Sequence, residues 1–331
     1  MHALLIGYGS IGKRHLAQLE RRCESVAVID PFVEQPRELK KGTTFHRSLL
    51  NYQDELKQDL GSKKHVDVGV IANWGPGHFE TFLEMRKIGV RKFLIEKPVA
   101  SRMSDLDSLE EIIARDKLQV WSNYHLRFEK STNYLRDFLK KNKIGNPSLM
   151  TVTGGAKCLA TTGVHWIDYF FEFTENEEFT VNAKINIEQI NPRSPELSFL
   201  EGFINLSKNK SSLNISFTNE SYADSNIEIY WKSFKVQISG GIFRMLKSEN
   251  PEIGTLPITR TAPFTDIIYE DVLGGSGFDS LYEEFFSTTT DMPRLFDANR
   301  WLLESLIYND SHPIKSLPSR IELRDKDYLI S

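Results

Sequence analysis

HALLIGYGSIGKRH, residues 2–15, decides the fold of the first part of this 331-residue chain. A short apolar run is followed at once by Gly7, Gly9 and Gly12, which form the pattern G-x-G-x-x-G. In this pattern the first glycine allows a tight turn, the second lets backbone approach a pyrophosphate, and the third lets a helix pack closely on the strand. The stretch therefore predicts a strand, a phosphate-binding loop and a helix.

An acidic residue follows the next apolar run. Asp30 ends the predicted strand 26–29 and lies 18 residues after Gly12. A carboxylate at this place accepts hydrogen bonds from both hydroxyls of an adenosine ribose and repels a 2′-phosphate, while helix-start amides such as those of Ser10 and Ile11 hold phosphates. We therefore expect a dinucleotide site that takes NAD in preference to NADP. The alternative is a glycine-rich turn in an unrelated α/β protein, with Asp30 as a turn residue before proline.

Strands and helices alternate over the first 123 residues. Further strands are predicted at 66–71, 92–95 and 118–121, and helices at 13–22, 78–87 and 104–115, the last with Ser104 as its N-cap. Parallel strands need crossover connections, so this alternation predicts a doubly wound parallel sheet.

After Asn123 the pattern changes. A helix is predicted at 129–141, and short strand-like segments separated by turns follow between 148 and 245, which predicts a mainly antiparallel sheet. Residues 249–277 are rich in Pro, Gly and Thr and are predicted to form a long loop before helices at 280–288 and 296–308. A chain of this length exceeds one usual core, so we expect an N-terminal domain of residues 1–123 and a second domain of residues 124–331.

Composition excludes several classes of protein. The net charge of −4 gives no sign of nucleic-acid or anionic-membrane binding. No apolar run approaches the roughly 20 residues of a membrane span. With only Cys23 and Cys158, a disulfide framework or thiolate zinc site is not expected, and the histidines show no metal-ligand grouping. We expect a cytoplasmic protein without a metal.

The stretch KFLIEKPVA, residues 92–100, carries the first catalytic candidate. An apolar strand delivers Glu96, Lys97 and Pro98 at its carboxyl end, the edge of a doubly wound sheet where ligands bind. An ammonium group beside a substrate hydroxyl stabilises the developing alkoxide. On spacing alone, an exposed Glu–Lys pair at a strand end is the simpler interpretation.

The stretch LATTGVHWIDYF, residues 159–170, contains the second catalytic candidate, His165. Near the start of a helix the dipole favours a neutral imidazole, the form of His165 that accepts a proton from a hydroxyl. Thr161 or Thr162 can cap the helix, Thr161 shares a face with His165, and Asp168 is placed to pair with it. The alternative is a partly buried helical histidine bonded to Asp168 or to backbone.

Four stretches together, GYGSIGKRH, GPGHFETFLEMRKIGVRKFLIEKPVA, NYHLRF and GVHWIDY, resemble the Gfo/Idh/MocA family of glucose–fructose oxidoreductase and inositol dehydrogenase relatives. The resemblance covers the dinucleotide domain and the first third of the second domain. It implies a Rossmann domain followed by an α+β domain whose large, open, mainly antiparallel sheet builds an oligomer interface, so we expect a homodimer or homotetramer through that sheet. The reaction it implies is hydride transfer between NAD(P) and a carbinol carbon of a sugar, sugar nucleotide or cyclitol.

The resemblance also implies roles for individual residues. Lys97 contacts the reacting hydroxyl and His165 is the general acid/base. Cofactor contacts fall on Gly7, Gly9, Ser10, Ile11, Gly12, Asp30, Asn73, Trp74, His78, Glu96, Lys97 and Pro98. Substrate contacts fall on Lys97, Asn123, Arg127, Thr161, Thr162 and His165.

Two departures from the family pattern stand out. Asn73-Trp74-Gly75 replaces the usual Thr-Pro-Asn, and Thr161 replaces an aspartate that many members carry four residues before the histidine. The sequence predicts an NAD-dependent oxidoreductase acting on a small sugar-type substrate. Two alternatives stay open: a relative that keeps its cofactor and uses transient oxidation for elimination or hydrolysis, and a non-catalytic NAD-binding regulatory relative.

Overall fold

The computed structural model describes residues 1–34, 39–58, 65–174, 179–187, 190–191, 194–249, 262–311 and 323–330. It divides into two compact units. The N-terminal unit combines Met1–Asn123 with Tyr282–Phe296 and Asp325–Ser331, and the C-terminal unit combines Tyr124–Leu281 with Asp297–Arg324. The boundary expected after Asn123 therefore leaves out two segments that return to the first unit.

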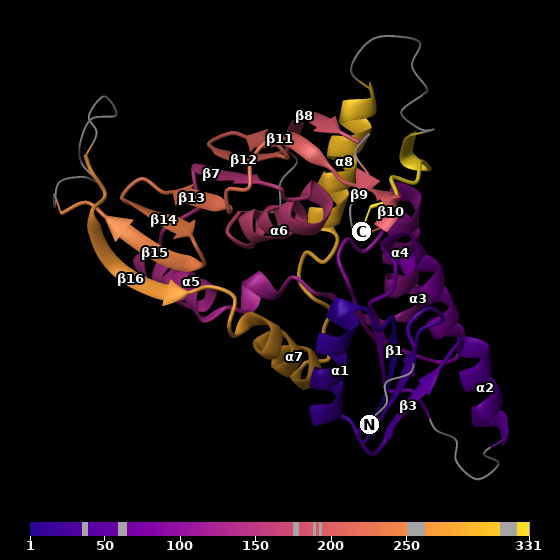
Figure 1. Cartoon of the computed structure of the whole chain (residues 1–331). Coiled ribbons are helices and arrows are strands. Elements are labelled where there is room, and N and C mark those ends of the chain that lie inside the picture. Colours follow the sequence, from indigo (N-terminus) through magenta and orange to yellow (C-terminus); the bar gives the residue numbers. More distant parts are fainter. Residues whose placement is uncertain are drawn as a thin grey trace. The chain divides into compact units, whose positions relative to one another are not determined.

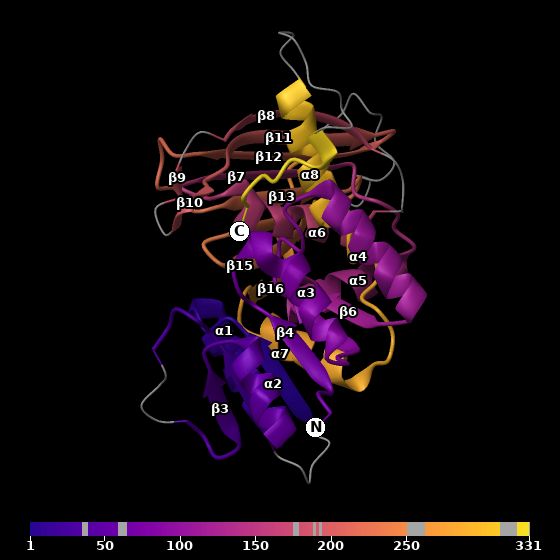
Figure 2. The ribbon, with the colours of Figure 1, turned by 90° about the vertical axis from the view of Figure 1, so that its right-hand side faces the viewer.

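The N-terminal unit is built on a six-stranded parallel sheet in the order β3-β2-β1-β4-β5-β6. Its strands are β1 (His2–Ile6), β2 (Ser25–Ile29), β3 (Thr43–His46), β4 (Val68–Ile71), β5 (Lys92–Ile95) and β6 (Gln119–Ser122). Its helices within the first 123 residues are α1 (Ser10–Arg22), α2 (Leu49–Gln58), η1 (Gly75–Gly77), α3 (His78–Lys87) and α4 (Met103–Asp116). Helix α1 lies on one face of the sheet and α2, α3 and α4 lie on the other (Figures 1 and 2). This layered arrangement confirms the predicted Rossmann fold.

The sequence patterns missed some local details of this unit. Strand β3 and helix α2 were not predicted. Helix α4 begins at Met103 after Arg102 and has no side-chain cap, so the expected Ser104 cap is wrong. Returning residues cover the edge strand β6: Met292 N donates to Val120 O (3.3 Å), and Val120 N donates to Asp291 Oδ1 (2.8 Å). These bonds satisfy an edge that would otherwise pair with another chain.

The C-terminal unit is built on an eight-stranded sheet in the order β16-β15-β14-β13-β7-β12-β11-β8, antiparallel except for the pair β7–β12. Its strands are β7 (Leu149–Gly155), β8 (Thr180–Asn186), β11 (Glu201–Lys208), β12 (Ser211–Thr218), β13 (Asn226–Tyr230), β14 (Phe234–Ser239), β15 (Ile242–Lys247) and β16 (Asp266–Val272), and β9 (Ile190–Asn191) pairs with β10 (Ser194–Ser198). The sheet confirms the mainly antiparallel prediction.

Helices cover one face of this sheet. They are η2 (His125–Phe128), α5 (Lys130–Asn142), the π-helix η3 (Leu159–Gly163), α6 (Val164–Glu172) and α8 (Asp297–Ser311), and α7 (Gly277–Ser287) links the two units in the chain. Helices α6 and α8 pack against each other and against the sheet (Figure 1). On β12 the residues Leu213, Ile215 and Phe217 are buried while the alternate Asn, Ser and Thr side chains are exposed, so the opposite face is polar.

The loop predicted before the last helices of this unit is wrong in part. Residues 249–277 were expected to be a loop, but Asp266–Val272 forms β16 and pairs with β15. Ile267 and Val272 on this strand are 51% and 71% exposed, because an edge strand has a single neighbour. The apolar alternation is correspondingly weak, and residues 250–261 lie outside the described residues.

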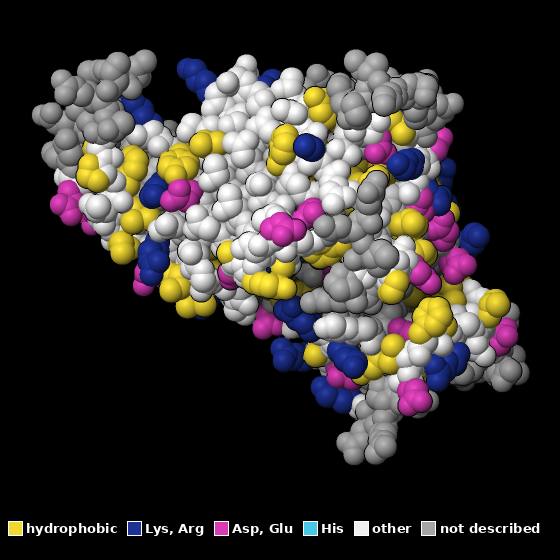
Figure 3. Space-filling model, turned by 45° about the horizontal axis from the view of Figure 1, so that its top comes forward, with side chains coloured by type: hydrophobic (Ala, Val, Ile, Leu, Met, Phe, Trp, Pro, Cys, Tyr) yellow, Lys and Arg dark blue, Asp and Glu magenta, His cyan; other side chains and the backbone are white. Residues whose placement is uncertain are grey.

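Basic and acidic side chains are interspersed on the face that Figure 3 shows. Within the part of the chain that the structure describes, no helix combines the length and apolarity needed to cross a membrane.

Candidate active site

The glycine loop has the backbone that a dinucleotide requires. Gly7 has φ +97°, and a Cβ there would lie 2.4 Å from Ala72 O. A Cβ on Gly12 would lie 2.1 Å from Gly7 O, so only glycine lets α1 approach the turn this closely. Gly9 differs, because a Cβ there meets no atom within 4 Å and a phosphate can approach its backbone. The loop fits the pyrophosphate of NAD(P).

Asp30 is tied to this loop. Its carboxylate is 7% exposed and accepts Tyr8 N at 2.7 Å on one oxygen, and Phe32 N and Val33 N at 2.8 and 2.9 Å on the other. Asp30 therefore connects the end of β2 to the glycine turn. The oxygen that accepts only Tyr8 keeps acceptor capacity for a ribose hydroxyl.

Of the predicted cofactor residues that follow β4, His78 is buried and Trp74 is exposed. His78 is 1% exposed, and its ring nitrogens lie 2.9 Å from Pro98 O and 3.1 Å from Asn73 O. Burial lowers the pKa of His78, although the contacts with the carbonyls of Asn73 and Pro98 oppose this shift. The ring thus joins the loops that follow β4 and β5. Asn73 donates to Thr81 Oγ1 at 2.9 Å, whereas Trp74 is 44% exposed. Of these predicted cofactor residues, Trp74 presents the most surface to a ligand.

Glu96 is the centre of a buried network in the N-terminal unit. Its Oε1 lies 2.8 Å from His15 Nε2 and accepts Asn123 Nδ2 at 2.6 Å, and its Oε2 accepts Lys97 N at 3.3 Å. Burial alone would raise the pKa of Glu96, but the hydrogen bond and charge of His15, helped by Lys97 and Asn123, lower it to about 2. Glu96 is therefore ionised at neutral pH.

The network continues from His15 to Tyr282. The other ring nitrogen of His15, Nδ1, lies 2.6 Å from the hydroxyl oxygen of Tyr282. Burial, followed by the charge of Glu96, raises the pKa of Tyr282 well above its usual value, so the phenol stays protonated. Neither residue is predicted as a site residue from the sequence. His15 lies three positions after Gly12 and belongs to a quoted motif, but no local signal links it to Tyr282.

Lys97 stands directly beside this ionised carboxylate. It is half-buried, and its peptide bond to Pro98 is cis. A buried negative charge next to it favours the ammonium form, which is the form that polarises an oxygen.

In the C-terminal unit, Arg127 and Asp168 form a buried ion pair. Arg127 Nε donates to Asp168 Oδ2 at 2.8 Å, a second guanidinium N–H donates to Oδ1, and the two residues are 4% and 1% exposed. Burial raises the pKa of Asp168 to about 6, although the guanidinium opposes this shift. The expectation that Asp168 supports His165 is corrected, because both of its oxygens are bound to Arg127.

The rings of three residues meet beside this ion pair. The His165 ring on α6 lies edge to face with His125, with centroids 5.0 Å apart at 72°, and with Tyr124, 6.2 Å apart at 90°. Tyr124 is fully buried, whereas both histidines are half-buried. His125 was quoted in a motif but not predicted as a site residue.

Thr161 and Thr162 lie in the π-helix η3 immediately before α6. The cap residues of η3 and α6 are Cys158 and Gly163, and neither makes a side-chain cap bond, so the expected threonine cap is wrong. A π turn closes from i to i+5 and an α turn from i to i+4, so Thr161 lies almost one turn before His165 on the same face. Both threonines are half-buried.

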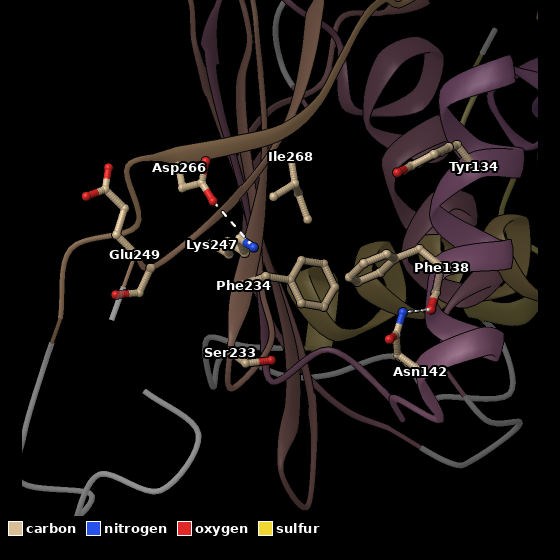
Figure 4. A pocket seen from close by; sticks show the side chains of 10 residues that line it. Tyr134, Phe138, Asn142, Ser233, Phe234, Lys247, Glu249, Asp266 and Ile268 are labelled. Carbon is tan, nitrogen blue, oxygen red and sulfur yellow. Dashed lines mark hydrogen bonds and ion pairs between the residues drawn. The ribbon is translucent and has the colours of Figure 1, made fainter. Parts of the chain in front are cut away.

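A hollow of about 750 Å³ lies elsewhere in the C-terminal unit, between α5 and the strands β14 to β16 (Figure 4). It is lined by Tyr134, Phe138, Asn142, Ser233, Phe234, Lys247, Ser248, Glu249, Asp266 and Ile268. The Phe138 and Phe234 rings point toward each other and pack edge to face with centroids 5.2 Å apart, and Lys247 pairs with Asp266 at 3.4 Å. The residues predicted from the sequence as site residues do not line this hollow.

Residues 1–124 match a family model described as an oxidoreductase family with an NAD-binding Rossmann fold. An inositol 2-dehydrogenase/D-chiro-inositol 3-dehydrogenase from Shouchella clausii is 28% identical over 150 residues, a stretch that covers 44% of this chain and 42% of the relative. The match therefore spans less than half of that relative.

Solved structures match over most of the chain. A UDP-N-acetylglucosamine 3-dehydrogenase from Acidithiobacillus ferrooxidans has a TM-score of 0.64 at 15% identity, covering 92% of this chain and 95% of the other. A myo-inositol 2-dehydrogenase from Lactobacillus plantarum has a TM-score of 0.65 at 16% identity, covering 93% and 96%. At these identities the likeness shows that both units share the fold.

Proposed function

Because the N-terminal part of the chain belongs to the Gfo/Idh/MocA oxidoreductase family, we propose that the protein is an NAD-dependent dehydrogenase or reductase. It moves hydride between nicotinamide and a carbinol carbon of a cyclitol, sugar or sugar nucleotide. The proposal draws its substrate class from the inositol and sugar-nucleotide dehydrogenases that the sequence and fold resemble.

The observation that carries the proposal is the link from the glycine loop to Lys97. His15 on α1, the helix that the glycine loop opens, binds Glu96, and the Glu96 carboxylate accepts the backbone N–H of Lys97. A cofactor helix and a lysine at the carboxyl end of β5 are thus joined by one buried, ionised side chain. This arrangement suits a site in which the lysine must be charged and fixed beside a bound dinucleotide.

The cofactor supplies the hydride-accepting and hydride-donating group. Backbone amides at Gly9, Ser10 and Ile11 hold its phosphates, and Asp30 accepts a ribose hydroxyl, which favours NAD over NADP. Trp74, exposed after β4, covers part of the bound cofactor.

Lys97 and His165 divide the work on the substrate. The ammonium of Lys97 donates to the reacting oxygen and stabilises negative charge as the O–H bond breaks, and His165 receives the proton. In the reverse direction His165 returns the proton to the oxygen. Thr161, on the same helix face, binds a neighbouring substrate hydroxyl.

A spectrophotometric panel tests the proposal. The protein is mixed with NAD or NADP and with inositols, aldoses and UDP-sugars, and the absorbance of reduced nicotinamide is followed. Lys97→Met and His165→Ala are each expected to lower kcat by roughly 10²-fold or more. Lys87→Met, an exposed lysine of α3, is the matched control and keeps full activity.

Two outcomes would contradict parts of the proposal. Turnover that survives both substitutions would remove the assigned roles. Product formation without net change in cofactor would favour transient oxidation during elimination or hydrolysis, and tight NAD binding without any turnover would favour a regulatory role.

We also propose that the chain self-associates through the open face of the large sheet. Phe203 on β11 is 37% exposed there, amid polar side chains of the neighbouring strands. Light scattering of wild type and Phe203→Asp tests this: a wild-type dimer or tetramer should become smaller in the variant, and an unchanged mass would refute this interface.

A further inference from the structure

The pair His125–His165 goes beyond the roles assigned above. The two rings lie edge to face with centroids 5.0 Å apart, and both residues are half-buried. His125 belongs to η2 and His165 to α6, segments that are forty residues apart in the chain.

The surrounding contacts hold the rings in this relation. Arg127, two residues after His125, is bonded to Asp168, three residues after His165, and this buried pair ties η2 to α6. Thr132 Oγ1 donates to Leu126 O at 2.6 Å and fixes the same turn from α5. Rings supported this way keep their spacing when a proton arrives.

The charges around the rings are defined within the C-terminal unit. Tyr124, just before η2, packs edge to face on His165. On α6, Asp168 is bound by the Arg127 cation of η2, and Glu172 lies 3.7 Å from Arg127 and 2.6 Å from Arg136 of α5. The buried Glu129, just before α5, accepts Ser276 Oγ at 3.0 Å.

Two imidazolium rings at this spacing repel each other. At an effective dielectric constant of about 20, like charges roughly 5 Å apart interact strongly enough to separate two titrations by a pH unit or more. Such groups release their protons in two steps that belong to the pair rather than to either residue.

We propose that His125 is a positioning residue for proton transfer: it titrates together with His165 as one pair and limits the pair to a single proton at neutral pH. This inference rests on the proposed role of His165. When a carbinol loses hydride to the nicotinamide, its hydroxyl proton passes to His165, and repulsion from a protonated His125 helps His165 release that proton to water. Reduction of a carbonyl runs the same exchange backwards, with water supplying the proton.

NMR titration of the histidine side chains in the full-length protein tests the inference without substrate or cofactor. In wild type the lower-titrating ring of the pair should respond in two steps. Replacing its partner, by His125→Gln or His165→Gln, should raise its midpoint by about one pH unit and leave a single step. His65→Gln, at a 65% exposed side chain of the other unit, is the control and should change neither ring.

The outcomes separate the inference from the proposed function. Independent single-step titrations in wild type, with midpoints that move by less than about 0.3 unit in either variant, would overturn the pairing. The wild-type curves decide this even if a variant fails to fold. Coupled titration without turnover of any sugar would sink the proposed function alone, and turnover with independent titration would sink the inference alone.

Discussion

The buried carboxylate of Glu96 gives a sharp test of the N-terminal unit. Glu96→Gln keeps the shape of the side chain but removes the charge that His15 and the Lys97 segment surround. The pKa of Glu96 in the folded protein is about 2, against 4.5 for the ordinary group. A difference of roughly 2.5 units corresponds to about 3 kcal/mol of stability at pH 7.

The sign follows from which state binds the proton. The unfolded chain protonates Glu96 first as pH falls, so the stabilisation is fully present above about pH 4.5 and is lost toward pH 2. The advantage of wild type over Glu96→Gln should therefore fall from about 3 kcal/mol at pH 7 to about 1 kcal/mol at pH 3. If Glu96→Gln acted only through packing or through the geometry of its hydrogen bonds, the difference in stability from wild type would not depend on pH.

Differential scanning fluorimetry between pH 7 and pH 3 measures this. The two units need not unfold together, so the transition that rises on addition of NADH is assigned to the N-terminal unit. Its Tm should drop by roughly 6–12 °C in Glu96→Gln at pH 7 and by a few degrees at pH 3. Glu80→Gln, at an exposed carboxylate of α3, is the control and should stay within about 2 °C. A drop at pH 3 as large as at pH 7 would refute the reasoning.

Three other substitutions test the site from different sides. Asp168→Asn removes the carboxylate that binds the buried Arg127 through two hydrogen bonds and should cost about 3–5 kcal/mol in thermal unfolding. The double variant Asp168→Leu with Arg127→Met should cost less, and equal losses would contradict this. Thr161→Asp places a carboxylate one turn from His165 and should raise the midpoint of that ring by about one pH unit by NMR, with no change arguing against a shared face. Gly9→Ala meets open space, so Tm should hold within about 2 °C while NADH affinity, followed by fluorescence, falls at least tenfold; unchanged affinity would remove the loop from the cofactor site.

Most of the fold could be predicted from short sequence patterns because turns, strands and helices are determined largely by residues that are close together in the chain. The glycine spacing fixes a turn, a close helix and a phosphate site within a few residues, and the structure gives Gly7 and Gly12 the crowded backbone expected of them. The apolar run before Glu96 is a buried strand on sequence grounds alone, and β5 confirms it. Strand β16 was missed since exposure of Ile267 and Val272 blurs the alternation on which such predictions depend.

The partners of site residues were harder to predict because they come from distant parts of the chain. Tyr282 binds His15 across 267 positions, and Arg127 binds Asp168 across 41. The sequence places Asp168 three residues after His165, which suggests that the two side chains pair. It does not show that the buried Arg127 binds both carboxylate oxygens of Asp168. The packing of η2 on α6 determines that Asp168 binds Arg127 and not His165.

The pairing of Asp168 with Arg127 affects how the threonine at position 161 is interpreted. An aspartate at position 161 would stabilise a protonated His165. Asp168 does not take over this role because both of its carboxylate oxygens are bound to Arg127. The nearest ring is instead another histidine, His125, whose protonation opposes that of His165. In the proposed function, repulsion between the two rings and the lack of a carboxylate at position 161 both favour release of a proton from His165. The threonine at position 161 is therefore consistent with the proposed proton release, and the titration of the histidine pair tests that proposal directly.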